Sequence, residues 1–393
     1  MPFGTSPLSG RRSRACMRVV HVYRTYFPDP PGGLQEAVRQ ICIAVGNAGA
    51  ENRIFTLSPR PDPARLARPE GEVVRARSWA APASCDLGGP SALAAFRDCV
   101  AWADVVHVHF PWPYADVLCA LSGGRRPLVV TYHSDIVRQR LLGKLYRPLM
   151  MRTLRRAAAV VATSPAYALT SPVLQVAGIR DKVEVIPLGI DENSYPTNRD
   201  ESVLARLGLV VGQPFFLFIG VLRYYKGLHT LLSAAAEVDA PIVIAGCGPQ
   251  DEWLRAQIAT EGLANVRLAG LVSETEKMAL LAHCSALVLP SHLRSEAFGM
   301  VLVEAAMHGK PMISCELGTG TSFVNLEGDT GFVVPPEQPA ALAAAMRRLL
   351  ADPELRAGMG AAARVRYEQR FSGGALGRSY AALFERVART GGT

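Results

Sequence analysis

The stretch PSHLRSEAFGMVLVEA, residues 290–305, decides how the rest of this chain is interpreted. It continues the apolar run Ser285–Pro290, which predicts a strand, and it turns at Gly299 before entering a predicted helix. The free N–H groups and the dipole at such a helix start favour an anion, most often a phosphate. Glu296 and Glu304 flank the turn, and Glu304 needs a polar partner among its apolar neighbours, such as a ribose diol. The stretch therefore predicts half of a nucleotide-sugar site.

Strand-like and helical runs alternate along both halves of the chain, which predicts an α/β protein of two doubly wound, Rossmann-like domains. Apolar β-branched runs such as Val105–Val108 are typical of buried parallel strands. We expect parallel sheets covered on both faces, with ligands at the carboxyl ends of their strands. The predicted strands are 18–22, 53–57, 105–109, 128–132, 159–163, 183–187, 215–220, 241–245, 266–269, 286–289, 311–314 and 331–334, and the main predicted helices are 34–48, 92–102, 136–156, 227–237, 251–260, 274–282, 300–308, 339–351, 353–370 and 374–389.

A chain of 393 residues is too long for one ordinary core, so two domains are expected. We predict an N-terminal, acceptor-binding domain over residues 17–192 and a C-terminal, nucleotide-sugar-binding domain over 193–372. The turn-rich segment Pro187–Pro196 marks the junction. Residues 1–16 lack the apolar core of a signal peptide and are predicted to be a disordered tail. The predicted helix within 373–393 completes the chain.

The composition indicates a globular protein whose first half has an anionic partner. Hydrophobic residues make up 49% and charged residues 19%, and no apolar run reaches the ~20 residues that span a bilayer. The eight cysteines form no C-x-x-C pair, so neither a zinc site nor a disulfide framework is indicated, and a cytosolic compartment is expected. Residues 1–195 carry 24 Lys and Arg against 15 Asp and Glu, a net of +9, whereas the remainder has a net of −1.

Arg223 and Lys226 lie in a loop between a predicted strand and the helix that begins at Gly227. Two cations at this spacing can hold a diphosphate, Arg bidentately and Lys as a point charge. Taken alone, such a pair is more often a solvated loop. Because this loop and residues 290–305 both follow strands of the same predicted domain, we favour the diphosphate clamp. The sequence has no Asp-x-Asp motif, so a metal-bridged diphosphate is not indicated and no metal is expected.

Polar residues also follow the predicted strands of the first half. The pair Gly32-Gly33 would let backbone approach a phosphate, although a structural turn explains it equally well and no G-x-G-x-x-G fingerprint is present. His133 either faces the ligand or packs, and Asp135 either orients an acceptor or caps a helix. His107 and His109 share a strand face, yet no third metal ligand is visible nearby, and His109 could instead line the site.

The segment 138–156 alternates cations with Leu, Met and Tyr. Such a helix can lie on an anionic membrane surface, and a solvated helix whose apolar stripe packs on the sheet is equally consistent. The basic first half favours the membrane slightly.

Taken together, the Gly32-Gly33 loop, Gly220-x-x-Arg223-x-x-Lys226-Gly227 and Glu296-x7-Glu304 resemble the retaining glycosyltransferases of family four. The resemblance covers roughly residue 17 to the C-terminus. The stretches Thr131–Asp135 and Glu316–Ser322 are similar to those of mannosyl- or rhamnosyltransferases of lipopolysaccharide O-chain synthesis. The resemblance implies the GT-B fold, in which two Rossmann-like domains face each other across a cleft and the C-terminal helix crosses back to the first domain.

The same resemblance implies a role for each matching residue. Arg223 and Lys226 would hold the diphosphate and stabilise it as it leaves, and Glu304 would bind the ribose hydroxyls. Glu296 and His133 would contact the donor sugar, so that His133, Glu296, Arg223 and Lys226 form the implied catalytic set. The other implied donor-binding positions act through backbone groups: Gly32, Gly33, Phe298, Gly299, Met300 and Val301. His109 and Asp135 are expected near the acceptor.

The implied activity is the transfer of a mannose- or rhamnose-type sugar from a nucleoside-diphosphate donor to a glycan or polyprenyl-linked acceptor. A GDP-sugar is favoured over a UDP-sugar, and no cofactor or nucleic acid is expected. The expected location is the cytoplasm, at the inner face of the cell membrane. The alternatives are a GT-B sugar-nucleotide epimerase and a degenerate nucleotide-sugar-binding protein.

Overall fold

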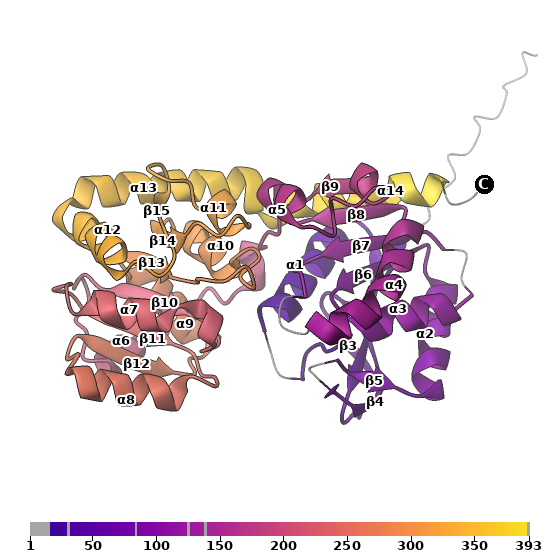
Figure 1. Cartoon of the computed structure of the whole chain (residues 1–393), viewed down its shortest axis with the longest axis horizontal. Coiled ribbons are helices and arrows are strands. Elements are labelled where there is room, and N and C mark those ends of the chain that lie inside the picture. Colours follow the sequence, from indigo (N-terminus) through magenta and orange to yellow (C-terminus); the bar gives the residue numbers. More distant parts are fainter. Residues whose placement is uncertain (1–15, 30–31, 83–84, 124–125, 137–139, 391–393) are drawn as a thin grey trace, which may run out of the picture.

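The computed structural model describes residues 16–29, 32–82, 85–123, 126–136 and 140–390. The predicted tail, residues 1–16, lies outside this part of the chain except for Cys16. The chain forms two α/β halves side by side, each built around its own sheet (Figure 1).

The first half has a nine-stranded sheet in the order β3-β4-β2-β1-β6-β7-β8-β9, with β5 paired to β4. Its strands are β1 (Arg18–Val22), β2 (Glu51–Ser58), β3 (Arg65–Arg68), β4 (Gly71–Ala80), β5 (Leu87–Gly88), β6 (Val105–Phe110), β7 (Leu128–Tyr132), β8 (Ala159–Ala162) and β9 (Val183–Val185). Its helices are α1 (Gly33–Asn47), α2 (Pro90–Trp102), α3 (Pro113–Leu121), α4 (Arg140–Arg156) and α5 (Pro165–Thr170).

The expectation of a purely parallel sheet is wrong for the edge of the first half. There β3 and β5 pair antiparallel with β4, and none of these three strands was predicted. Arg75 interrupts the apolar residues of β4, so the sequence of this segment does not have the pattern of a buried strand. Arg75 is nevertheless buried because its guanidinium donates to the Ser58 hydroxyl and to the Arg60 carbonyl.

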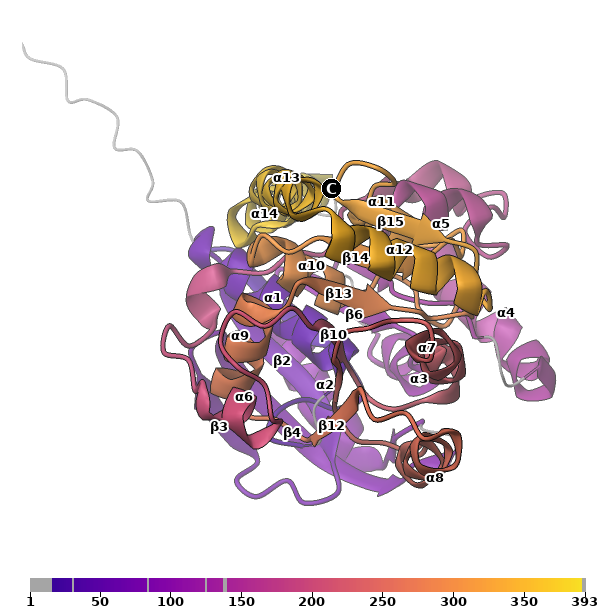
Figure 2. The same ribbon diagram turned by 90° about the vertical axis from the view of Figure 1, so that its left-hand side faces the viewer.

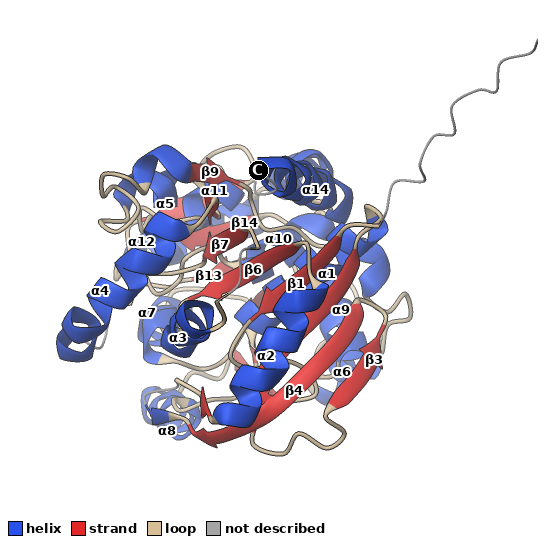
Figure 3. Cartoon of the chain, turned by 90° about the vertical axis from the view of Figure 1, so that its right-hand side faces the viewer, coloured by secondary structure: helices blue, strands red, loops and turns tan. Residues whose placement is uncertain are grey.

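Successive side chains of the central strands point to opposite faces of the sheet. Val20 and Val22 pack against α2 on one face, whereas Val19 and His21 face α1 on the other (Figure 3). Both faces are covered, as expected for mostly parallel strands.

The second half has a six-stranded, fully parallel sheet in the order β12-β11-β10-β13-β14-β15. Its strands are β10 (Phe216–Ile219), β11 (Ile242–Ala245), β12 (Val266–Gly270), β13 (Ala286–Leu289), β14 (Met312–Cys315) and β15 (Gly331–Val334). Its helices are α6 (Ser202–Arg206), α7 (Leu228–Ala235), α8 (Asp251–Glu261), α9 (Glu274–His283), α10 (Met300–Met307), α11 (Thr321–Val324), α12 (Pro339–Ala351) and α13 (Pro353–Arg366). Figure 2 shows α7, α8 and α12 on one face of this sheet, and α9 and α10 on the other.

The last helix, α14 (Gly373–Thr390), leaves the second half and packs against α1 (Figure 1). Gly377 makes the contact close, because a Cβ there would lie 2.4 Å from the Ala44 carbonyl oxygen. Tyr380 of α14 hydrogen-bonds Thr131 of β7 at 2.8 Å. The C-terminal helix therefore completes the core of the N-terminal half.

The carboxyl ends of β7 and β13 face each other across the two halves. Arg294, which follows β13, donates to the Thr170 hydroxyl at 3.0 Å and lies 3.7 Å from the Asp135 carboxylate. Thr170 in turn donates to the Gly318 carbonyl at 2.7 Å. These contacts bring the loops that carry the predicted site residues together.

Candidate active site

A buried ion pair joins two of the predicted site residues. Lys226 ends a short 3₁₀ turn after β10, and its Nζ lies 2.5 Å from Glu296 Oε2 in the loop after β13. The two loops are adjacent because β10 and β13 are neighbours. The Ser291 hydroxyl donates to the same Glu296 oxygen at 3.1 Å. Although burial opposes the charge, Glu296 raises the pKa of Lys226, so the ammonium is retained.

Gly227 lets the two loops touch. It has a φ of 70° and a Cβ there would lie 2.0 Å from the Pro290 carbonyl oxygen, so no larger residue fits without moving the backbone. The cationic loop is thereby held against the start of the stretch 290–305.

Arg223 differs from Lys226 because it is exposed and its guanidinium has no hydrogen bond or ion pair within the described residues. Its charge is close enough to the first half to affect Tyr23: burial raises the pKa of Tyr23, and the positive charges of Arg24 and Arg223 oppose that rise. Arg223 thus lies toward the N-terminal half with its guanidinium available to an anion.

Glu304 already has polar partners inside the protein. Tyr195 donates its hydroxyl proton to Glu304 Oε1 at 2.7 Å, and Lys277 Nζ donates to the same oxygen at 3.0 Å. Lys277 also pairs with Glu274 at 2.8 Å, and these carboxylates raise its pKa against the opposing effect of burial. Sequence reasoning missed Tyr195 and Lys277, which come from the linker and from α9. Both bonds go to Oε1, which leaves Oε2 as the oxygen open to another donor.

Two helix starts provide backbone N–H groups near these side chains. Gly299 caps α10 with a φ of 84°, and no side-chain cap is found there in the described structure. Phe298 is buried with its ring 6.1 Å from that of Phe371, so only its backbone is available to a ligand. Met300 and Val301 begin α10, where N–H groups have no intrahelical acceptor.

The start of α1 is similar. Gly32 caps it without a side-chain cap from any described residue, and a Cβ on Gly33 would meet open space. Glu36 in the first turn is close enough to Glu304 and Lys277 to sense their charges; burial and the Glu304 charge raise its pKa, and Lys277 lowers it. The first turn of α1 therefore approaches the Glu304 side of α10.

His133 is the outermost member of a row of buried histidines. Its Nε2 lies 3.0 Å from His109 Nδ1, and 5% of its surface is accessible, whereas His109 is fully buried. The expected direct contact of His109 with an acceptor does not fit this burial. His21 supplies the third histidine beside His107 and His109 that the sequence did not reveal, because β1 pairs with β6 in the register His21↔His107. Their ring nitrogens are hydrogen-bonded to one another, which satisfies them without an ion.

Asp135 makes contacts within the protein. Its Oδ1 accepts hydrogen bonds from the Tyr132 hydroxyl at 3.0 Å and the Ser171 hydroxyl at 2.7 Å, and its Oδ2 lies near Arg294. These partners give Asp135 a part in the contact between the halves, and its acceptor role stays a prediction.

The described part of 138–156 is helix α4, with residues 138–139 outside the described structure. Met150, Met151 and Leu154 are buried against the first-half core, whereas Leu145 is 82% exposed. Among the described residues, no helix combines the length and apolarity required to cross a membrane.

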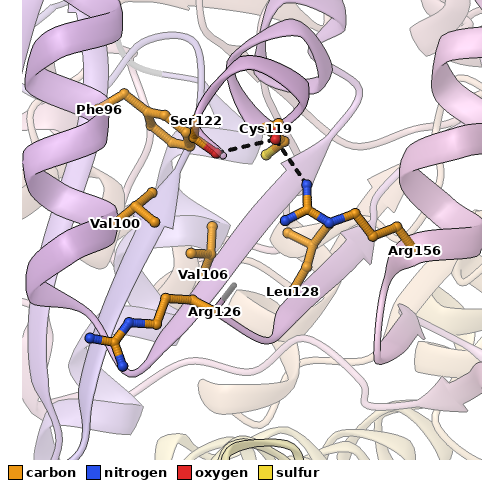
Figure 4. Close-up of a pocket in the computed structure, with 8 residues that line it drawn as sticks. All are labelled: Phe96, Val100, Val106, Cys119, Ser122, Arg126, Leu128 and Arg156. Carbon is orange, nitrogen blue, oxygen red and sulfur yellow. Dashed lines mark hydrogen bonds between the residues drawn. The ribbon is translucent and has the colours of Figure 1, made fainter. Parts of the chain in front are cut away.

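A small pocket in the first half lies away from these residues. Figure 4 shows it at the amino ends of β6 and β7, where Arg156 donates to the Cys119 carbonyl at 2.9 Å. Because the predicted site residues follow the carboxyl ends of the strands, this pocket lies at the opposite end of the strands from the candidate site.

Comparison with known proteins gives the same assignment for both halves. Residues 31–194 match the family model described as Glycosyltransferase Family 4, and residues 200–366 match Glycosyl transferases group 1. D-rhamnosyltransferase WbpZ of Pseudomonas aeruginosa is 48% identical over 91% of this chain and 92% of its own length. O-antigen chain mannosyltransferase C of Escherichia coli is 38% identical over 94% of this chain and 98% of its own.

Solved structures share the fold at lower identity. Sucrose-phosphate synthase from Thermosynechococcus elongatus superposes with a TM-score of 0.78 at 22% identity, covering 95% of this chain and 100% of that one. HepE of Anabaena, in complex with UDP and glucose, gives a TM-score of 0.76 at 21% identity, covering 94% and 100%.

Proposed function

Because this chain belongs to the family 4 glycosyltransferases and has their GT-B fold, we propose that it transfers a mannose- or rhamnose-type sugar from a nucleoside-diphosphate donor to a glycan or polyprenyl-linked glycan. The process we propose is lipopolysaccharide O-chain or related cell-surface polysaccharide synthesis. The support is the similarity over most of the chain to a D-rhamnosyltransferase and an O-antigen mannosyltransferase. A GDP-sugar is the first donor to test and a UDP-sugar the second.

The observation that carries this proposal is the pairing of an exposed cation with a buried ion pair on adjacent loops. Arg223 is available to an anion, and Lys226 is held by Glu296 at the same end of the sheet. As the bond from the sugar to the diphosphate breaks, negative charge develops on the leaving phosphate. Fixed cations and backbone N–H groups directed at that charge lower the barrier. In this proposal Arg223 and Lys226 provide the stabilisation that a metal ion provides elsewhere, and no cofactor is involved.

The hydrogen-bond and ion-pair partners of Glu304 and Glu296 indicate how each would contact the donor. Glu304 Oε1 is occupied by Tyr195 and Lys277, so we assign Oε2 to a ribose hydroxyl. Glu296 would meet the sugar while remaining paired with Lys226. The first turns of α1 and α10 would donate backbone N–H groups to the diphosphate and sugar.

We propose retention by attack on the same face of the sugar. The departing phosphate would take the proton of the attacking hydroxyl, which requires no separate protein base. Approach of the halves over the donor would exclude water and limit hydrolysis.

We propose that the enzyme works in the cytoplasm at the inner membrane face. The exposed Leu145 beside Arg147 on α4 is the supporting feature, and sedimentation with anionic against neutral vesicles tests it.

A thermal-shift screen with GDP-, UDP- and dTDP-sugars tests the donor, since a ligand that binds only the folded state raises the melting temperature. Arg223→Ala should retain wild-type stability and lower kcat by about 10²-fold. Arg255→Ala is the control, because Arg255 is also exposed and pairs only locally with Asp251. Near-normal turnover of Arg223→Ala would refute the proposal, and sugar conversion without an acceptor would indicate an epimerase.

A further inference from the structure

His133 is connected to the interior of the first half by a continuous line of hydrogen bonds between histidines. His109 Nδ1 lies 3.0 Å from His133 Nε2, and His109 Nε2 lies 3.4 Å from His21 Nδ1. At the inner end, His21 Nε2 lies 3.3 Å from Asn52 Oδ1. Each of these contacts needs one protonated atom and one bare atom, so the position of one proton constrains the next.

Asn52 fixes the first proton. Its Nδ2 lies 2.8 Å from the Cys42 carbonyl and 3.2 Å from the Glu70 carbonyl, and these oxygens can only accept. The amide nitrogen must therefore be on that side, and the amide oxygen must face His21. His21 Nε2 consequently carries a proton and donates it to Asn52 Oδ1.

The rings in the line are neutral, so each carries only one proton. They are buried, and Phe384 covers His21 and His107 on the side of α14. Burial lowers the pKa of His21 to about 4 and that of His133 to about 3, and it lowers the pKa of His109 well below its usual value. With its proton on Nε2, His21 has a bare Nδ1 that can only accept.

The constraint then passes outward to His133. His109 Nε2 faces the bare nitrogen of His21, and two bare nitrogens facing each other would repel, so His109 carries its proton on Nε2. Its Nδ1 is then bare and accepts from His133 Nε2. His133 must have its proton on Nε2 and a bare Nδ1, and Nδ1 has no partner in the part of the chain that the structure describes.

His107 forms a side branch from His21, and its hydrogen bonds also need one donor and one acceptor each. His107 Nδ1, 3.1 Å from His21 Nδ1, must donate, so its Nε2 accepts from the Thr131 hydroxyl at 2.7 Å. The Tyr380 hydroxyl donates in turn to Thr131 at 2.8 Å. In this arrangement each hydrogen bond of the cluster has one donor and one acceptor, and the N–H groups of His107 and His109 share the lone pair of His21 Nδ1.

We propose that this line of hydrogen bonds presents His133 to the ligand as a hydrogen-bond acceptor through Nδ1, and that Asn52 is the positioning residue that sets this tautomer. The sugar contact rests on the proposed function: His133 would accept a proton of a donor-sugar hydroxyl. Neutral His133 would then select a hydroxyl at that place on the sugar and would not act as a general acid.

Nitrogen NMR of the wild-type protein, free of ligand and labelled with ¹⁵N in histidine, tests the tautomer directly. His133→Gln assigns the signal by its loss. We expect Nε2 of His133 to show the shift of a protonated nitrogen and Nδ1 that of a bare one. A protonated Nδ1 would overturn the proposal. This measurement does not depend on catalysis. If the proposed function is wrong, no nucleotide-sugar will bind, but His133 will still show the expected tautomer.

Asn52→Leu tests the positioning role, with Tyr380→Phe as the matched control. Asn52→Leu removes the acceptor for His21, so His133 should populate both tautomers and bind the donor identified by thermal shift about tenfold more weakly. Tyr380→Phe removes a buried hydroxyl from the side branch only and should leave the His133 spectrum unchanged. An unchanged His133 spectrum in folded Asn52→Leu would overturn the role of Asn52. If Asn52→Leu does not fold, Asn52→Ala removes the same acceptor without added bulk, and an unchanged His133 spectrum in that variant would overturn the role of Asn52.

Discussion

Lys226 and Glu296 neutralise each other in the interior, with Nζ and Oε2 2.5 Å apart and each side chain about one-tenth exposed. Removing one partner leaves an unpaired buried charge, which is far more costly than removing both. Loss of activity in a Lys226 variant would therefore combine a catalytic effect with a structural one, and Arg223 is the cleaner probe of diphosphate binding.

Lys226→Met should lower the free energy of unfolding by about 3–5 kcal/mol, because Glu296 remains buried without its cation. Urea unfolding measures this. The double variant Lys226→Met/Glu296→Leu should recover most of the loss, since neither charge remains. If the double variant were as unstable as the single one, the ion pair would not be the cause.

Tyr195→Phe should lower the free energy of unfolding by about 1.5–3 kcal/mol, because a buried carboxylate loses one of its two donors. Donor binding should also weaken, since Glu304 is no longer held in one position. Calorimetry with the donor identified by thermal shift measures the second effect. Tyr224→Phe is the control, because Tyr224 is 52% exposed and its hydroxyl makes no hydrogen bond to any described residue. Equal effects in the two variants would contradict the assignment.

The buried histidines should make the protein less stable in mild acid. Their folded pKa values, about 4 for His21 and about 3 for His133, lie below the unfolded value of 6.5, so the unfolded chain binds more protons between these values. The stability is fully present above about pH 6.5 and is lost as the pH falls, by about 2 kcal/mol per histidine at about pH 5.

Urea unfolding at the two pH values checks this expectation. Asp116 acts in the opposite direction because burial raises its pKa to about 6. The decisive test is therefore a comparison with His133→Gln. Between about pH 6.5 and pH 5, its free energy of unfolding should fall by about 2 kcal/mol less than that of the wild type. The same pH-dependent loss in both proteins would contradict the burial of His133 in its neutral form.

Arg294→Met should loosen the contact between the halves. Arg294 donates to the Gly318 carbonyl at 2.9 Å and to Thr170, and its guanidinium lies 5.3 Å from the centre of the Tyr167 ring. X-ray scattering in solution should show a larger radius of gyration without unfolding. Asp135→Asn keeps the Thr170 bond and removes only the charge, so its effect should be smaller; no change in Arg294→Met would show that other contacts hold the halves.

Gly377→Ala should destabilise the docking of α14 on α1, because the added Cβ would lie 2.4 Å from a backbone oxygen. We expect a loss of about 1–3 kcal/mol in unfolding free energy. Gly374→Ala adds the same methyl group to the same helix, where the nearest atom is the end of the Arg378 side chain at 3.4 Å, and it should be neutral. Equal losses in the two variants would contradict the close contact as the cause, because Ala favours a helix over Gly at either position.

The periodicity of the sequence predicts the second-half strands well because each is a short apolar run between turn residues. Ala286–Leu289 and Gly331–Val334 match the structure at both ends. It fails at β4, where Arg75 is buried because the Ser58 hydroxyl and the Arg60 carbonyl accept hydrogen bonds from its guanidinium. Local pattern cannot reveal partners that come from other segments.

The same limit applies to the candidate site. The sequence brings Glu296 and Lys226 to one region but does not predict that they pair with each other. His21 was missed because its contact with His107 depends on which strands are neighbours. Tyr195 and Lys277 were missed because they meet at Glu304 only when the linker and α9 are folded together.

The position of α14 also has a consequence for the order of events during synthesis. Tyr380 and Phe384 lie against histidines of β1 and β6, which are made more than two hundred residues earlier. The N-terminal half is synthesised first. The face of its sheet that carries His21 and His107 is incompletely covered until α14 has been translated. Because contacts between such distant segments form slowly, we expect the nascent N-terminal half to expose these histidines until translation is complete.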